Sequence, residues 1–108
     1  MKIKNIAQSE PLKLDELVTV SEGQIVSRTL AQNGHVSLTL FAFAKGEEIS
    51  THASGGDALV TVFEGKAKIT VGGKEFIVKG GESILMPANV SHALEAIEDF
   101  KMSLTVVF

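Results

Sequence analysis

Three side chains in this sequence could form a single binding or metal site: His52, Ser54 and His92. Positions 52 and 54 lie two apart in a stretch that reads as a strand, so both side chains would point to one face. Imidazoles bind divalent transition metals such as Zn, Ni, Fe or Mn, and near neutral pH they also exchange protons with a ligand. The pattern therefore predicts either a polar pocket or a metal centre.

A catalytic metal centre normally needs three protein donors, and these positions supply fewer good ones. The hydroxyl of Ser54 is a weak ligand beside imidazole, which leaves His52 and His92 as an incomplete set. Asp57 is a less favoured donor, because strand alternation turns it away from the interior unless the preceding Ser-Gly-Gly forms a bulge. Three interpretations stay open. These residues form a ligand pocket at His52, Ser54 and His92, or a metal site at His52 and His92, or a vestigial site that binds no ligand.

No catalytic residue can be assigned from the sequence. The third histidine, His35, directly follows Asn33-Gly34 and is expected to be an exposed turn residue rather than part of the site.

The composition excludes several other kinds of chemistry. The 108 residues contain no cysteine, which rules out a disulfide, a thiolate metal site and a cysteine nucleophile. The net charge of −3 leaves no basic surplus to neutralise nucleic-acid phosphates. No apolar run reaches the ~18 residues that cross a bilayer, and residues 1–16 lack the apolar stretch of a signal peptide. We therefore expect a single cytoplasmic domain with no nucleic-acid or membrane partner.

Short strands make up most of the chain after residue 16. Asn33-Gly34 and Gly72-Gly73 are residue pairs that tight hairpin turns prefer. Residues 11–18, with a proline at the start, predict at most one short helix. Many short strands with glycine-rich turns are typical of an all-β sandwich or small barrel. The expected strands are 24–32, 35–44, 58–65, the hairpin 66–81, 82–89, 91–98 and 100–108.

Residues 46–65 and 81–96 resemble the two sequence motifs of the cupin superfamily. The family motifs run G-x5-H-x-H-x3–4-E-x6-G and G-x5-P-x-G-x2-H-x3-N, and both spacings are kept here. The matching residues are Gly46, His52, Ser54, Ala58 and Gly65 in the first motif, and Gly81, Pro87, Asn89, His92 and Ala96 in the second.

This resemblance implies the fold, a double-stranded β-helix or jelly-roll barrel over residues 24–108. In the family, the two histidines and the glutamate of the first motif and the histidine of the second converge on one divalent metal. Here Ser54 and Ala58 stand at two of those four positions. Asn89 replaces a motif glycine and tolerates a left-handed backbone. The resemblance therefore favours the fold and argues against a complete metal set.

The resemblance implies a small-molecule-binding barrel of unknown ligand, with its pocket at His52, Ser54 and His92. The alternative is a metal-dependent cupin enzyme of the oxygenase, isomerase or decarboxylase type that uses His52 and His92. Small cupins resemble one another in forming homodimers, so we expect a homodimer here, with residues 1–23 as an exchange arm that carries the short helix. Candidates for the contact between subunits are Phe41, Phe43 and Phe108.

Overall fold

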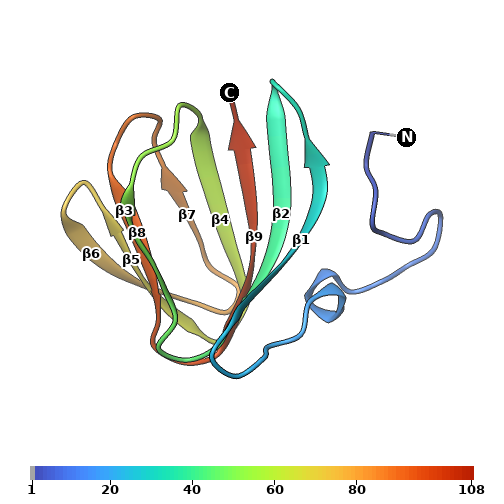
Figure 1. The fold of residues 1–108 in the computed structure, drawn as a ribbon, viewed down its shortest axis with the longest axis horizontal. Helices are drawn as coiled ribbons and strands as arrows, with labels where there is room; N and C mark the ends of the chain where they lie inside the picture. The colour runs from blue at the N-terminus through green and yellow to red at the C-terminus, as the bar shows by residue number, and fades with distance from the viewer. Residues whose placement is uncertain (1) are drawn as a thin grey trace.

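Residues 2–108, which the computed structural model describes, form two antiparallel sheets that face each other (Figure 1). This part of the chain contains nine strands and one four-residue 3-10 turn. The all-β prediction is confirmed. The elements are η1 Leu14–Leu17, β1 Ile25–Gln32, β2 Val36–Phe43, β3 Glu48–His52, β4 Asp57–Glu64, β5 Lys66–Val71, β6 Lys74–Lys79, β7 Ser83–Met86, β8 His92–Ala96 and β9 Phe100–Val107.

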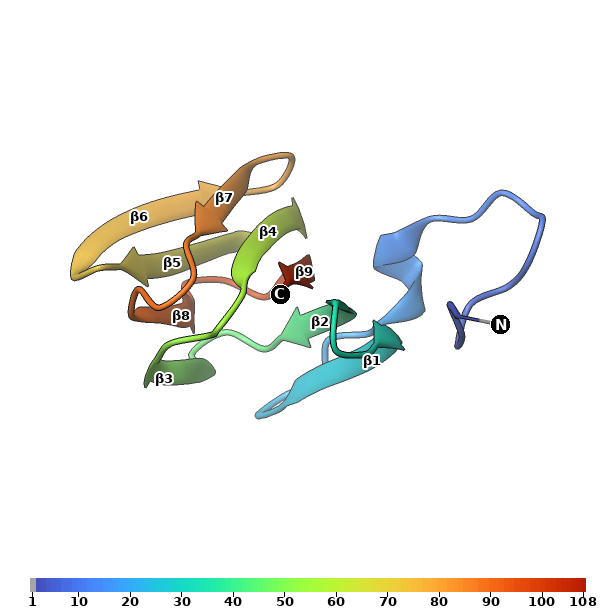
Figure 2. The same cartoon turned by 90° about the horizontal axis from the view of Figure 1, so that it is seen from above.

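The chain crosses repeatedly between the two sheets, and this crossing builds the jelly roll. One sheet has the strand order β1-β2-β9-β4-β7, and the other has the order β3-β8-β5-β6. Seen from above, these strands form two layers, with the N-terminal segment outside the five-stranded one (Figure 2). As a consequence, β3 and β8 are hydrogen-bonded neighbours although about 40 residues separate them in sequence.

The hydrophobic core lies between the sheets and follows the alternation of the strands. In β4, Ala58, Val60 and Val62 point inward and are buried, as period-two alternation requires. The rings of Phe43 and Phe100 stack at the centre with their centroids 4.5 Å apart. Each fully buried side chain of this size contributes about 1.5–3 kcal/mol relative to exposure. This core holds the two sheets, and therefore β3 and β8, in place.

A second apolar cluster covers the outer face of β1 and β2. Val18, from the N-terminal segment, is buried there against Leu30, Leu40 and Ala42. Farther along the segment, the backbone N–H of Lys4 donates a hydrogen bond to the Leu30 carbonyl at 2.8 Å. Both faces of β2 are therefore covered.

Phe43 is fully buried inside the barrel, so its expected place in a contact between subunits is wrong. Phe41 also packs against the core between the sheets. Of the three candidates, Phe108 is the one that is largely exposed.

One local expectation needs correction. The hairpin after β1 exists, but its connection comprises residues 33–35, and neither Asn33 nor Gly34 has a positive φ. Instead the Asn33 side-chain oxygen accepts hydrogen bonds from the N–H groups of His35 and Val36, as an Asx turn does. The Gly72-Gly73 turn has the expected positive φ angles, 58° and 82°. The helix expected within 11–18 is the single turn η1.

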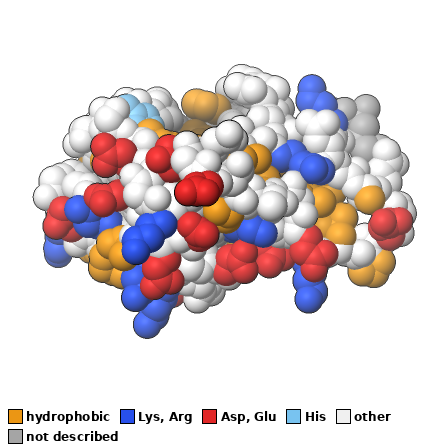
Figure 3. Space-filling view, turned by 60° about the horizontal axis from the view of Figure 1, so that its bottom comes forward, with side chains coloured by type: hydrophobic (Ala, Val, Ile, Leu, Met, Phe, Trp, Pro, Cys, Tyr) orange, Lys and Arg blue, Asp and Glu red, His pale blue; other side chains and the backbone are white. Residues whose placement is uncertain are grey.

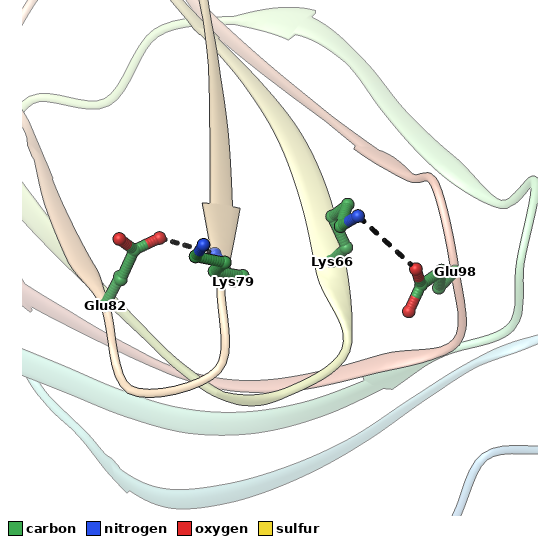
Figure 4. Close-up of polar contacts among 4 residues, drawn as sticks. All are labelled: Lys66, Lys79, Glu82 and Glu98. Carbon is green, nitrogen blue, oxygen red and sulfur yellow. Dashed lines mark hydrogen bonds and ion pairs between the residues drawn. The ribbon is translucent and has the colours of Figure 1, made fainter.

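Charged side chains cluster at the end of the barrel where β5 begins and β8 ends. Figure 3 shows acidic and basic groups interspersed over this end. Lys66 pairs with Glu98 at 3.6 Å, and the Glu82 carboxylate accepts a hydrogen bond from the Lys79 backbone N–H at 3.0 Å (Figure 4). Exposed pairs of this kind contribute little to stability. The histidine pair lies at the opposite end, where β3 ends and β8 begins.

Candidate functional site

A bulge in β3 brings His52 directly opposite His92. Ile49 pairs with Leu94 and His52 pairs with His92, so three steps along β3 match two steps along β8. In a regular strand, residues three apart point to opposite faces, but the bulge lets both Ile49 and His52 line the barrel interior. The first and the last histidine of the two motifs are thus brought together.

The two imidazoles share a hydrogen bond, with Nε2 of His52 and Nε2 of His92 3.0 Å apart. Nδ1 of His52 lies 2.9 Å from the Ser50 carbonyl oxygen, which can only accept, so this nitrogen carries the proton. In the neutral ring, Nε2 of His52 is then an acceptor, and Nε2–H of His92 must be the donor. Nδ1 of His92 is buried and makes no hydrogen bond of ordinary geometry within the part of the chain that the structure describes.

The two imidazole rings differ in their exposure to solvent. His92 is only 4% exposed, whereas His52 is exposed at the end of an edge strand. Burial lowers the pKa of His92 below its usual value, and the positive charge of a protonated His52 lowers that pKa further, while the backbone of Val90 opposes the shift. His92 is therefore neutral near physiological pH.

The histidine pair closes one end of a cavity of about 200 Å³ between the sheets. Its walls are otherwise mainly apolar, and they come from both sheets. The sequence alone could not say which apolar residues lie at the level of the histidines. The lining residues are Ile49, His52, Ser54, Ala58, Met86, His92, Leu94, Met102, Leu104 and Val106.

Ser54 lines the cavity, although not as a strand residue. Strand β3 ends at His52, so the expected strand spacing of positions 52 and 54 is wrong. The Ser54 side-chain oxygen accepts a hydrogen bond from the Gly56 N–H at 3.1 Å, and its own hydroxyl proton remains available to a ligand.

Asp57 is turned away from the cavity, as strand alternation predicted. Its Oδ1 accepts a hydrogen bond from the Ala88 N–H at 2.8 Å, which ties the first motif to the second. His35 is exposed in the loop between β1 and β2 and does not reach the site.

The donors present do not fit a catalytic metal ion. The anchoring of His52 Nδ1 on a backbone carbonyl is usual for a metal-ligating histidine. However, the neutral Ser54 hydroxyl is a weak ligand that already accepts from the Gly56 amide, Asp57 is engaged by Ala88, and Ala58 has no donor. Within residues 2–108, no group of three or more His, Cys, Asp or Glu side chains is placed to hold a metal.

A larger and more open groove, of about 530 Å³, lies along strands β6 and β7. Its lining includes Phe76, Ile84 and Pro87, and Lys74 lies over the Phe76 ring. This groove is far less enclosed and has no histidine in its lining, so the smaller cavity is the better candidate for chemistry.

The backbone at the motif positions explains why their residue types are needed. Gly65 has a φ of +86°, and a Cβ there would collide with the Asp99 carbonyl and with Phe100. Asn89, at a motif position that is glycine in the family, adopts a φ of 63°, as its left-handed tolerance predicted. Its N–H donates to the Ser54 carbonyl at 2.8 Å, a second link between the motifs.

No helix in the described part of the chain is long and apolar enough to cross a membrane. A search of curated proteins returned no match.

Solved structures with the same fold are numerous. A conserved protein of unknown function from Streptococcus pyogenes is 42% identical, with a TM-score of 0.97 over 99% of this chain and 94% of that one. A cupin superfamily protein from Desulfitobacterium hafniense is 32% identical, with a TM-score of 0.94 over 100% of this chain and 99% of that one. A cupin 2 conserved barrel domain protein from Leptotrichia buccalis is 47% identical, with a TM-score of 0.88 over 90% of this chain but 47% of that longer protein.

These structures agree with the topology described above. The family described as "Cupin domain" matches residues 39–108, which include both motifs and both histidines of the pair. The expected superfamily and the jelly-roll fold are confirmed: the chain belongs to the cupin family.

Proposed function

We propose that this cupin binds a small molecule in the cavity that the His52–His92 pair closes. The observation that carries the proposal is a mainly apolar space of about 200 Å³ that ends in two facing imidazoles and the Ser54 hydroxyl. Binding sites for small molecules are usually concave and apolar with a few convergent polar groups. The arrangement supports binding and orientation of a ligand more directly than it supports any reaction.

Size limits the ligand. Sites for drug-sized molecules commonly measure about 300–1,000 Å³, and an apolar cavity of roughly 150 Å³ holds a benzene ring. The cavity here, of about 200 Å³, therefore has room for one ring or a short aliphatic chain with a small substituent.

Filling the cavity tests the proposal. Ala58 is buried and lines the cavity, so Ala58→Leu should occupy the space that a ligand needs. Ala93→Leu makes the same change outside the cavity lining and is the matched control. In a thermal-shift screen of monocyclic and short aliphatic compounds, we expect stabilisers that act on the unmodified protein and on the Ala93→Leu variant but not on the Ala58→Leu variant. Either no stabiliser at all or stabilisation that survives Ala58→Leu would contradict the proposal.

A metal-dependent enzyme that uses His52 and His92 is the competing function. The observation in its favour is that both Nε2 atoms point to one place while Nδ1 of His52 is held by the Ser50 carbonyl. Two protein donors fall short of the usual three, which is why binding without a metal is the better-supported function. Metal analysis of protein prepared without an affinity tag or chelator decides between them: we expect well under one equivalent per chain. One equivalent that disappears in His52→Ala, but not in His35→Ala, would favour the enzyme.

We also propose that the protein is a homodimer. Leu59 and Leu85 are direct neighbours on β4 and β7, and both are exposed on the outer face of the five-stranded sheet. Val107, on the adjacent β9, is exposed beside them. A second copy of the chain that covers these three apolar side chains would remove them from water.

A further inference from the structure

We propose that the ligand of this cavity is a small uncharged molecule that carries one hydroxyl group on an apolar body, such as an alcohol or a phenol. The inference rests on the proposed binding function and adds the chemical class of the ligand. It follows from which atom of each imidazole carries a proton, and not from cavity size alone.

The histidine pair presents one acceptor and one donor. Because the Ser50 carbonyl holds the proton of His52 on Nδ1, Nε2 of His52 presents a lone pair. Nε2 of His92 lies 3.0 Å away, and for this contact to be a hydrogen bond His92 must supply the proton. If both Nε2 atoms were unprotonated, two lone pairs would face each other at this distance. A ligand group that replaces their mutual hydrogen bond must therefore accept from His92 and donate to His52, and a hydroxyl does both with one oxygen.

Charged groups match this pair poorly. A carboxylate only accepts, so it would satisfy His92 but face the lone pair of His52. An ammonium group only donates, so it would satisfy His52 but face the N–H of His92. The cavity lining within the described residues contains no Asp, Glu, Lys or Arg to compensate for either mismatch. An uncompensated charge in a mainly apolar cavity is also poorly solvated.

The difference in exposure between His52 and His92 indicates which ring moves when a ligand hydroxyl enters between them. Two hydrogen bonds of ordinary length require the two nitrogens to separate from 3.0 Å to roughly 4.5–5 Å. His92 is buried and fixed by its surroundings, whereas His52 is the exposed last residue of β3, an edge strand. His52 therefore moves outward, and the apolar body of the ligand lies against Met86, Leu94 and Met102.

The first experiment tests the protonation pattern directly. Long-range hydrogen–nitrogen NMR spectra of the ¹⁵N-labelled protein at about pH 8, above the ordinary imidazole pKa, identify which nitrogen of each neutral histidine carries the proton. We expect the proton on Nδ1 of His52 and on Nε2 of His92. Finding the proton of His52 on Nε2 would overturn the inference, whatever the ligand.

The second experiment compares four probes of nearly equal size at about pH 8: benzyl alcohol, benzoate, benzylamine and toluene. Two of the three methionines in the chain, Met86 and Met102, line the cavity, so their ¹³C-methyl signals report binding directly. Benzyl alcohol should bind at least about tenfold more tightly than benzoate and benzylamine, because each of these leaves a buried donor or acceptor unpaired. It should also bind more tightly than toluene, which offers the histidine pair no hydrogen bond.

Two histidine variants separate the role of the His52 acceptor from the effect of removing a histidine elsewhere in the protein. His52→Ala removes the acceptor and should narrow the preference for benzyl alcohol over benzoate to within about threefold, since a carboxylate then meets only the donor of His92. His35→Ala changes a histidine outside the site and should leave the preference unchanged.

The outcomes distinguish failure of the proposed binding function from failure of the proposed ligand class. If none of the four probes shifts the two methionine signals, both the binding function and its ligand class are contradicted. If benzoate, benzylamine or toluene binds as tightly as benzyl alcohol, the cavity binds small molecules but the hydroxyl class is wrong.

Discussion

Oδ1 of Asp57 accepts a hydrogen bond from the backbone N–H of Ala88 at 2.8 Å, and this bond joins the two cupin motifs at the mouth of the barrel. The Asp57 carboxylate thereby holds the loop between β7 and β8. The loop in turn precedes His92, so the bond helps to position the buried member of the histidine pair.

Removal of this carboxylate should destabilise the fold without any metal being involved. We expect Asp57→Ala to lower the free energy of unfolding by about 1 kcal/mol, the usual net value of a hydrogen bond. Asp57→Asn keeps an oxygen acceptor and should lose less. Urea unfolding of the three proteins measures the difference, and an Asp57→Ala variant as stable as the unmodified protein would show that the bond has no structural role.

Gly65 should be far less tolerant of a side chain than Gly73. Both glycines have a positive φ, 86° and 82°, but a Cβ at position 65 would collide with the backbone of Asp99, whereas position 73 has nothing within 4 Å. Gly73→Ala should therefore cost about 1–2 kcal/mol from backbone strain alone. Gly65→Ala should cost clearly more. Equal melting temperatures for the two variants would contradict the close approach seen at Gly65.

The stability of the protein should fall as the pH drops below the ordinary imidazole pKa of about 6.5. Because burial depresses the pKa of His92 in the folded state, the unfolded chain binds this proton more readily, and stability rises with pH throughout the window between the two pKa values. Above that window His92 contributes no pH dependence. Unfolding free energies measured between about pH 5 and 8 give the slope.

His92→Gln should reduce this slope, whereas His35→Gln, in an exposed loop, should not. Carboxylates titrate mostly below this range, so the comparison isolates the imidazole. A slope that is the same in both variants and the unmodified protein would show that His92 is not responsible.

The predicted homodimer can be tested by mass in solution. Analytical ultracentrifugation at micromolar concentration should give twice the chain mass. Leu85→Lys places a charge among the exposed apolar side chains of the five-stranded sheet and should shift the mass toward that of one chain. Ile77→Lys makes the same kind of change on an exposed residue of β6, in the other sheet, and should leave the dimer intact. A monomer of the unmodified protein would contradict the prediction.

Local features of this fold follow from the sequence because they depend on nearby residues. Residues 58–65 were expected to form a strand, and in a strand Ala58, Val60 and Val62 share one face, which the structure buries. The Gly72-Gly73 pair predicted its turn because few other residues reach two successive positive φ angles. Asn33-Gly34 carries a similar signal, but there the Asn33 side chain bonds to the following amides and a different turn forms.

The sequence by itself determined the family, the all-β fold and the identity of the two histidines, since the motif spacing places His52 and His92 at ligand positions of a known barrel. The tertiary structure alone decided what these histidines can do. The contact between His52 and His92 arises from the bulge in β3 and from the pairing of β3 with β8, about 40 residues away in sequence. The Ser50 carbonyl then sets which nitrogen of His52 carries the proton. Such contacts depend on packing between distant segments, and no local pattern encodes which nitrogen carries a proton.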